Sequence, residues 1–173
     1  VKIRYKQTVM GAAWAILQPL ALMVVFTVVF TMFVKLPSDG VPYSIFTYVG
    51  LLPWTLTSNS LSFAVSSLIN VENLVTKIYF PREIIPLADI LASCVDFLVA
   101  SVILLGLLLW YRVPLHWTVV FVPLLLLVQL ELTCGLSLLG AALNVYYRDI
   151  RFIVPLGLQL WFYASPVVYP LSS

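Results

Sequence analysis

The sequence predicts an all-α, polytopic membrane protein, built as a bundle of transmembrane helices. Of its 173 residues, 62% are hydrophobic and only 9% are charged, far from the proportions of a water-soluble domain. Five apolar segments are long enough to cross a hydrocarbon core of about 30 Å. We therefore predict one membrane domain over residues 1–173, with spans at about 11–34, 43–70, 87–110, 118–143 and 152–170.

The basic residues indicate how these segments cross the membrane, because Lys and Arg are concentrated in cytoplasmic loops. With the N-terminus in the cytoplasm, only Lys35 and Arg112 fall on the far side. The other basic residues fall on the near side: Lys2, Arg4, Lys6, Lys77, Arg82, Arg148 and Arg151. We therefore expect a cytoplasmic N-terminus. Because the chain begins at Val1 and stops just after an apolar run, we also expect it to be part of a longer protein.

The first ten residues, VKIRYKQTVM, alternate basic and apolar side chains. As a helix they would lie in the headgroup layer, with Lys2, Arg4 and Lys6 toward anionic lipid. A basic flank of the first span explains the same residues equally well. Both interpretations place this segment at the cytoplasmic face.

The second span, 43–70, is unusually rich in small polar residues. Thr55, Asn59, Ser62, Ser66 and Asn70 recur at a spacing that puts all five on one helical face. Interhelical packing through small polar residues is the favoured interpretation. The alternative is that Thr55, Asn59, Ser62 and Ser66 line a translocation pathway.

The segment between the second and third spans, 71–86, is the most charged part of the interior of the chain and includes Lys77, Arg82 and Glu83. Charged groups and proline-broken backbone are costly in lipid, so this segment must lie in water or against a partner protein. We interpret it as a cytoplasmic docking loop. A second cytoplasmic loop is expected at 144–151.

Two carboxylates, Asp96 and Glu131, fall inside the third and fourth spans. Counted from the inner ends of these spans, at about 1.5 Å per residue, their depths differ by only a few ångströms. The first hypothesis for a charged residue inside a membrane span is that it belongs to a proton or substrate pathway. A carboxylate that forms a hydrogen bond between helices explains them as well, and the sequence leaves both interpretations open.

Catalytic machinery is not expected. The chain has one histidine and no cluster of carboxylates in a soluble segment. The spacing Gly135 to Gly140 resembles part of a phosphate loop, but Ala141 and Ala142 stand where that loop needs Lys and Ser or Thr. We expect no catalytic residue, no metal site and no cofactor bound by this chain.

Several short motifs follow one another in an order that resembles the permease subunits of ABC transporters of the type-2 exporter class. These subunits belong to the family that exports polysaccharides, namely O-antigen, capsule and teichoic acid. The resemblance spans nearly the whole chain. It rests on Tyr5 to Thr8, Gly11 to Trp14, Gln18-Pro19, Gly50 to Trp54, Lys77 to Glu83, Asn144 to Asp149 and Ser165-Pro166.

The resemblance implies a homodimer of permeases that carries a lipid-linked glycan outward across the cytoplasmic membrane of a bacterium. ATP and magnesium would be bound by separate ATPase subunits on the cytoplasmic side. By resemblance, residues 1–10 form an interface helix, and the ATPase docks at Lys77, Phe80, Arg82 and Glu83. The family also continues beyond a fifth span with re-entrant helices and a sixth span.

Two other functions remain open. A proton-coupled secondary transporter would use Asp96 and Glu131 as its relay and would need no ATPase. It should show an internal repeat, and we find none in the five segments. An exporter of the same ABC class that moves drugs or small lipids differs only in its substrate, and the motifs argue moderately against it.

Overall fold

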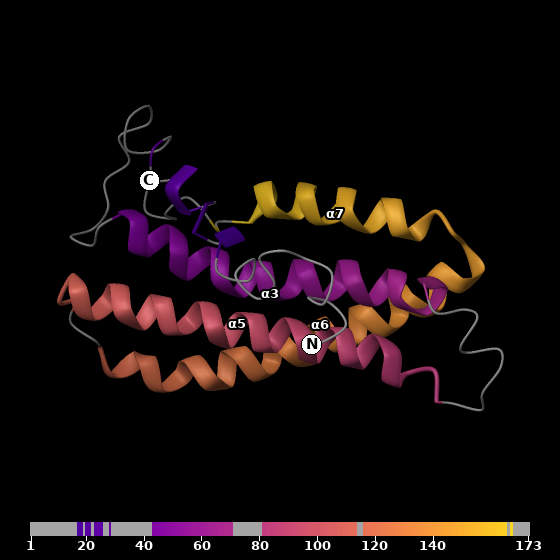
Figure 1. Cartoon of the computed structure of the whole chain (residues 1–173), viewed down its shortest axis with the longest axis horizontal. Helices are drawn as coiled ribbons and strands as arrows, with labels where there is room; N and C mark the ends of the chain where they lie inside the picture. Colours follow the sequence, from indigo (N-terminus) through magenta and orange to yellow (C-terminus); the bar gives the residue numbers. More distant parts are fainter. Residues whose placement is uncertain are drawn as a thin grey trace. The chain divides into compact units, whose positions relative to one another are not determined.

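A computed structural model describes residues 17, 18, 20, 21, 23–25, 28, 43–70, 81–113, 116–165 and 167 of the chain. The elements in this part are all helical, which confirms the all-α class (Figure 1). They are α3 (Tyr43–Asn70), α5 (Ile84–Trp110), the 3-10 helix η2 (Trp117–Phe121), α6 (Val122–Tyr146) and α7 (Ile150–Ala164).

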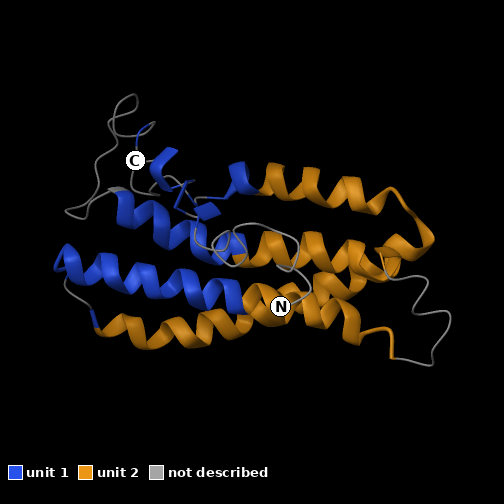
Figure 2. Ribbon diagram, viewed as in Figure 1, with its two compact units in different colours: residues 1–55, 95–116, 162–173 blue, residues 56–94, 117–161 orange. Residues whose placement is uncertain are grey.

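The chain divides into two compact units, coloured separately in Figure 2. Unit 1 consists of residues 1–55, 95–116 and 162–173, and unit 2 of residues 56–94 and 117–161. Unit 1 therefore holds the first half of α3 and the second half of α5. Unit 2 holds the second half of α3, the start of α5, all of α6 and most of α7.

Tyr48 is at the centre of unit 1. Its ring is fully buried and packs with Leu52 and Ala100. The Tyr48 hydroxyl donates a hydrogen bond of 3.2 Å to the main-chain oxygen of Ala100. A buried tyrosine hydroxyl needs such a partner, so this bond joins α3 to α5 within the unit.

A second contact in unit 1 joins α3 to the chain that follows α7. A Cβ added at Gly50 would collide with the main-chain oxygen of Val167. One turn further along α3, the rings of Trp54 and Phe162 have centroids 5.4 Å apart. The absence of a side chain at Gly50 is what allows the backbone at Val167 to pass so close.

Unit 2 is built on a contact between α3 and α6. Thr57 contacts Thr133, and Val65, further along α3, contacts Asn144, further along α6. Both helices advance in the same direction through these contacts, so α3 and α6 run parallel here. The buried face of α6 consists of small or polar residues, which allow close approach of membrane helices: Thr133, Ser137, Gly140, Ala141 and Asn144.

The end of α5 is closed by a Schellman motif. Arg112 has φ 51°, and the N–H groups of Val113 and Arg112 donate to the oxygens of Leu108 and Leu109 at 3.1 and 3.3 Å. These bonds satisfy carbonyl groups that the helix end leaves free. Residues 111 and 112 form the turn that follows the helix.

Two of the described helical segments are long and apolar enough to cross a membrane, Ile84–Trp110 and Trp117–Tyr146. A continuous apolar stripe on α5 is exposed along its whole length, as expected for a surface that faces lipid. The stripe consists of Leu91, Val95, Leu98, Val102, Leu105 and Leu109. The helix α7 is apolar but shorter, with 15 residues.

The structure corrects several predicted boundaries, although α3 has the predicted bounds 43–70. The helix α5 starts at Ile84 instead of residue 87, because Pro86 falls in its first turn, where a missing N–H costs nothing. The predicted loop 71–86 therefore ends at Glu83. The fourth span begins as η2 and continues to Tyr146.

The fifth helix ends earlier than predicted. The helix α7 runs from Ile150 to Ala164, and the prolines at 166 and 170 follow it, as is common after a helix end. Because α6 extends to Tyr146, the predicted loop 144–151 is reduced to residues 147–149 between two helices. The first span, 11–34, and residues 71–80 fall largely or wholly outside the described residues.

Candidate functional site

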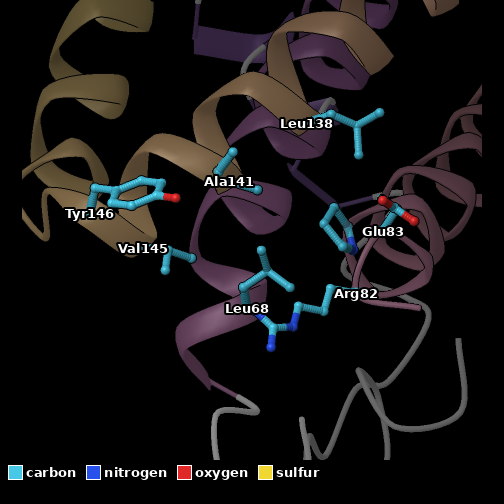
Figure 3. A pocket seen from close by; sticks show the side chains of 9 residues that line it. Leu68, Arg82, Glu83, Leu138, Ala141, Val145 and Tyr146 are labelled. Carbon is cyan, nitrogen blue, oxygen red and sulfur yellow. The ribbon is translucent and has the colours of Figure 1, made fainter. Parts of the chain in front are cut away.

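A pocket of about 280 Å³ lies within unit 2, where three helix ends meet. Leu68 comes from the end of α3, Arg82 and Glu83 from the turn before α5, and Tyr146 from the end of α6 (Figure 3). We call it the helix-end pocket. Its remaining lining is mostly apolar: Pro86, Leu138, Ala141, Ala142 and Val145.

The turn that carries Arg82 and Glu83 is fixed by main-chain hydrogen bonds. Ile84 N–H donates to the oxygen of Pro81 at 3.2 Å, and Leu87 N–H donates to the oxygen of Glu83 at 3.2 Å. Helix α5 therefore begins directly after these two residues, and their side chains are exposed at its N-terminus. A carboxylate in that position also interacts favourably with the helix dipole.

The chemistry of the pocket suits contact with a protein partner. It combines an apolar wall with one guanidinium and one carboxylate, and Figure 3 shows the side chains of Arg82 and Glu83 extending away from each other. Arginine and tyrosine beside desolvated apolar groups are typical of the residues that dominate protein interfaces. The pocket therefore offers an apolar contact with a charge of each sign at its edge.

Only part of the predicted docking set can be placed. Arg82 and Glu83 line the pocket, whereas Lys77 and Phe80 lie outside the described residues. The predicted interface helix, with Lys2, Arg4 and Lys6, also lies outside them.

The predicted polar stripe on α3 is not its most buried face. Asn59, Ser62 and Ser66 are half-buried. Thr55 is buried, and its hydroxyl donates to the oxygen of Leu52 on its own helix at 2.9 Å. The fully or nearly fully buried hydroxyls of the second half of α3 belong to a different face: Thr57, Ser60 and Ser67.

Sequence reasoning missed a polar cluster in unit 2. Thr57 Oγ1 accepts a hydrogen bond of 2.8 Å from Gln129 Nε2 and lies 3.4 Å from Thr133 Oγ1. The side chains of Ser60 and Ser137 are buried at 0% exposure. The signal was present in α6, where small and polar residues recur from Thr133 to Asn144 at helical spacing.

The two predicted carboxylates fall in different units. Asp96 is half-buried on the part of α5 that belongs to unit 1, and Glu131 is exposed on α6 in unit 2. Within the described residues, no three His, Cys, Asp or Glu side chains form a group that could hold a metal ion.

Two of the motifs on which the family resemblance rests lie beside segments from elsewhere in the chain. In unit 1, the segment Gly50 to Trp54 contacts Phe162 and Val167. In unit 2, Arg82 and Glu83 share the helix-end pocket with Tyr146. The fold therefore places Arg82 and Glu83 around the same pocket as Tyr146, which belongs to a motif far away in the sequence.

Comparison with known proteins agrees with this resemblance over the entire chain. A model of the ABC-2 type transporter family matches residues 1–173. The chain is 35% identical to the O-antigen export system permease protein RfbA of Myxococcus xanthus. The aligned region of 173 residues covers 100% of the chain. It is 31% identical over 171 residues, or 98% of the chain, to the protein of the same name from Klebsiella pneumoniae.

The chain spans 66% of the length of the Myxococcus protein and 65% of the Klebsiella protein. It is also 23% identical over 178 residues to the polysialic acid transport protein KpsM of Escherichia coli, with 100% of the chain and 67% of that protein covered. The match to the family model over every residue shows that the chain belongs to the ABC-2 type transporter family.

Proposed function

We propose that this chain is the permease part of an ABC exporter that moves a lipid-linked polysaccharide outward across the cytoplasmic membrane of a bacterium. A separate ATPase subunit supplies the energy. The observation that carries the proposal is the similarity of the whole chain to permeases named for O-antigen export. The likeness to a polysialic acid transport protein supports a polymeric sugar as the class of substrate, with O-antigen, capsular polysaccharide and teichoic acid as its members.

We propose a topology of five spans with a cytoplasmic N-terminus. The parallel course of α3 and α6 in unit 2 supports it. Two helices can cross a membrane in the same direction only when the chain returns between them, and α5 is long and apolar enough to be that return. The helix-end pocket then lies at the cytoplasmic face, at the end of α3 and the start of α5.

In this topology the helix-end pocket is the docking site for the ATPase subunit. Its apolar wall and its exposed Arg82 and Glu83 support that role. Lys77 and Phe80 belong to the same proposed docking set, and Lys2, Arg4 and Lys6 to the proposed interface helix at the cytoplasmic face. When ATP closes the ATPase dimer, the docked helix ends move with it, and a path opens between two copies of the permease.

The half-buried polar groups of Asn59, Ser62 and Ser66 are candidates for the wall of that path. Amide and hydroxyl groups can exchange hydrogen bonds with sugar hydroxyls as the polymer passes. Thr55 already bonds to its own helix, so we expect it to contribute less than the other three.

The test is to delete the permease gene in the host and to complement it with the full-length protein. We expect surface polysaccharide to disappear, lipid-linked glycan to accumulate at the inner face of the membrane, and both effects to be reversed by complementation. Normal surface polysaccharide in the deletion strain, with loss of resistance to a drug, would support a drug exporter instead. Export that survives without ATP and stops when the proton gradient collapses would support a secondary transporter.

A further inference from the structure

Asn144, near the end of α6, is fully buried and uses both ends of its side-chain amide. Its Nδ2 donates a hydrogen bond of 2.7 Å to the main-chain oxygen of Val65 on α3. Its Oδ1 accepts a hydrogen bond of 3.2 Å from the main-chain N–H of Arg151 in the first turn of α7. One side chain in unit 2 thus joins three helices.

The bond to Arg151 satisfies a group that α7 cannot satisfy by itself. The first four N–H groups of a helix have no partner within the helix. Phe152 and Ile153 donate to the oxygen of Asp149 at 2.9 and 3.1 Å, and Asn144 accepts from Arg151, directly before Phe152. Asn144, near the end of α6, therefore caps the N-terminus of α7. This bond helps to fix the orientation of the first turn of α7 relative to the end of α6.

The bond to Val65 is supported by close packing of the same two helices. Gly140 lies one turn before Asn144 on the buried face of α6, and a Cβ added there would be 2.6 Å from Val65 Cγ2. Val65 thus lies against the face of α6 that carries Asn144, and its main-chain oxygen is within reach of the Asn144 amide. Since a buried amide that loses its partner is costly, the two bonds hold Asn144 in one position.

The helix-end pocket is lined by neighbours of this junction. Leu68 follows Val65 by one turn on α3, and Ala141 and Val145 flank Asn144 on α6. We propose that Asn144 is a positioning residue that couples the helix-end pocket to α7. A displacement of the pocket wall is passed through Asn144 to the first turn of α7. This inference rests on the proposed function, because it assigns the coupling between ATPase docking and the spans to one side chain.

The test compares Asn144→Ala, Asn144→Asp and Gly140→Ala in the full-length permease assembled with its ATPase. Two quantities are measured in inverted membrane vesicles from the host: export of lipid-linked glycan per ATP hydrolysed, and hydrogen exchange of the main-chain amide of Arg151. Asn144→Asp keeps an oxygen for Arg151 and replaces the amide group that donates to Val65. Gly140→Ala keeps the side chain of Asn144 and perturbs the packing of α6 against Val65.

For Asn144→Ala we expect exchange at Arg151 to rise about fivefold, the effect of losing one hydrogen bond. Export per ATP should fall by a similar factor, while the ATPase still co-purifies in the wild-type ratio. For Asn144→Asp, export per ATP should fall while Arg151 stays protected, and this variant carries the test if Asn144→Ala does not accumulate. Gly140→Ala should lower the thermal stability and keep export per ATP near that of the wild type.

Wild-type export per ATP in either variant of Asn144 would overturn the inference. An equal loss in Gly140→Ala with Arg151 still protected would overturn it too, because packing of α3 on α6 would then explain the effect without the amide. Failure of the ATPase to associate with the wild-type permease has a different meaning, since it contradicts the proposed function itself.

Discussion

Gly140 of α6 and Val65 of α3 touch so closely that a Cβ at residue 140 would lie 2.6 Å from Val65 Cγ2. We predict that Gly140→Ala destabilises the full-length permease by about 1–3 kcal/mol, the usual cost of overpacking. This loss should exceed the gain of about 1 kcal/mol that alanine brings to a helix interior. Unfolding of the purified protein in a denaturing detergent measures the difference.

Gly135 on the same helix provides the control, because an added Cβ there meets nothing within 4 Å. Gly135→Ala should be neutral or stabilising by up to about 1 kcal/mol. If Gly140→Ala proved as stable as Gly135→Ala, the close contact between α3 and α6 would be wrong.

The hydroxyl group of Thr57 should contribute to the stability of unit 2. Thr57→Val removes the acceptor for Gln129 Nε2 at 2.8 Å and the contact with Thr133 Oγ1 at 3.4 Å. A buried donor that loses its acceptor costs about 1–3 kcal/mol, but bonds between membrane helices average about 0.6 kcal/mol. We therefore expect a loss of about 1 kcal/mol, measured by the same unfolding assay. Thr118→Val, at an exposed position of η2, should have no effect, and equal losses in the two variants would argue against the polar cluster.

Tyr48 tests the core of unit 1. Tyr48→Phe keeps the buried ring and removes the hydrogen bond of 3.2 Å to Ala100. We expect the free energy of unfolding to fall by about 1 kcal/mol, the typical net value of one bond. Tyr163→Phe serves as the matched control because Tyr163 is 67% exposed. A neutral Tyr48→Phe would contradict the assigned bond.

The sequence predicted the helices well where their ends are marked by residues of clear local effect. The bounds of α3, 43–70, were predicted correctly, because proline and glycine precede it and a charged segment follows it. The start of α5 was placed three residues late, since proline was taken to exclude helix although the first turn tolerates it. A proline thus indicates that a helix boundary is near and leaves its position open by one turn.

The buried face of α3 was harder to predict. Helical spacing identified the stripe of Thr55, Asn59, Ser62 and Ser66, but the residues buried in unit 2 include Thr57 and Ser60. Small polar residues occur on more than one face of α3, so their periodicity alone does not reveal which face meets a neighbour. Arg82 and Glu83 were predicted as a site by their charge, whereas Tyr146 and Leu68 joined them only through the fold.

The intramembrane carboxylates distinguish the ABC exporter from a proton-coupled transporter. Asp96 and Glu131 lie in different units, and export driven by ATP requires neither of them to carry protons. We predict that Asp96→Asn and Glu131→Gln retain export within about twofold of the wild type. Substitutions of residues that are not needed for a protein's function or core usually have effects of only about 0.5 kcal/mol. Export is measured in vesicles with ATP and an uncoupler. Loss of export in either variant at normal protein levels, with sensitivity to the uncoupler, would support the proton relay.

The most direct measurement is co-purification of the ATPase with the full-length permease, with Arg82→Ala and Glu83→Ala compared with the wild type. Truncation of an interface residue that contributes strongly to binding costs more than about 1 kcal/mol, so we predict that bound ATPase falls about five- to tenfold, with export falling alongside. Arg112→Gly is the control, because it removes an exposed guanidinium at the other end of α5 and glycine readily adopts its φ of 51°. Retention of the ATPase at wild-type levels by both variants, or loss of it by Arg112→Gly alone, would contradict docking at the helix-end pocket.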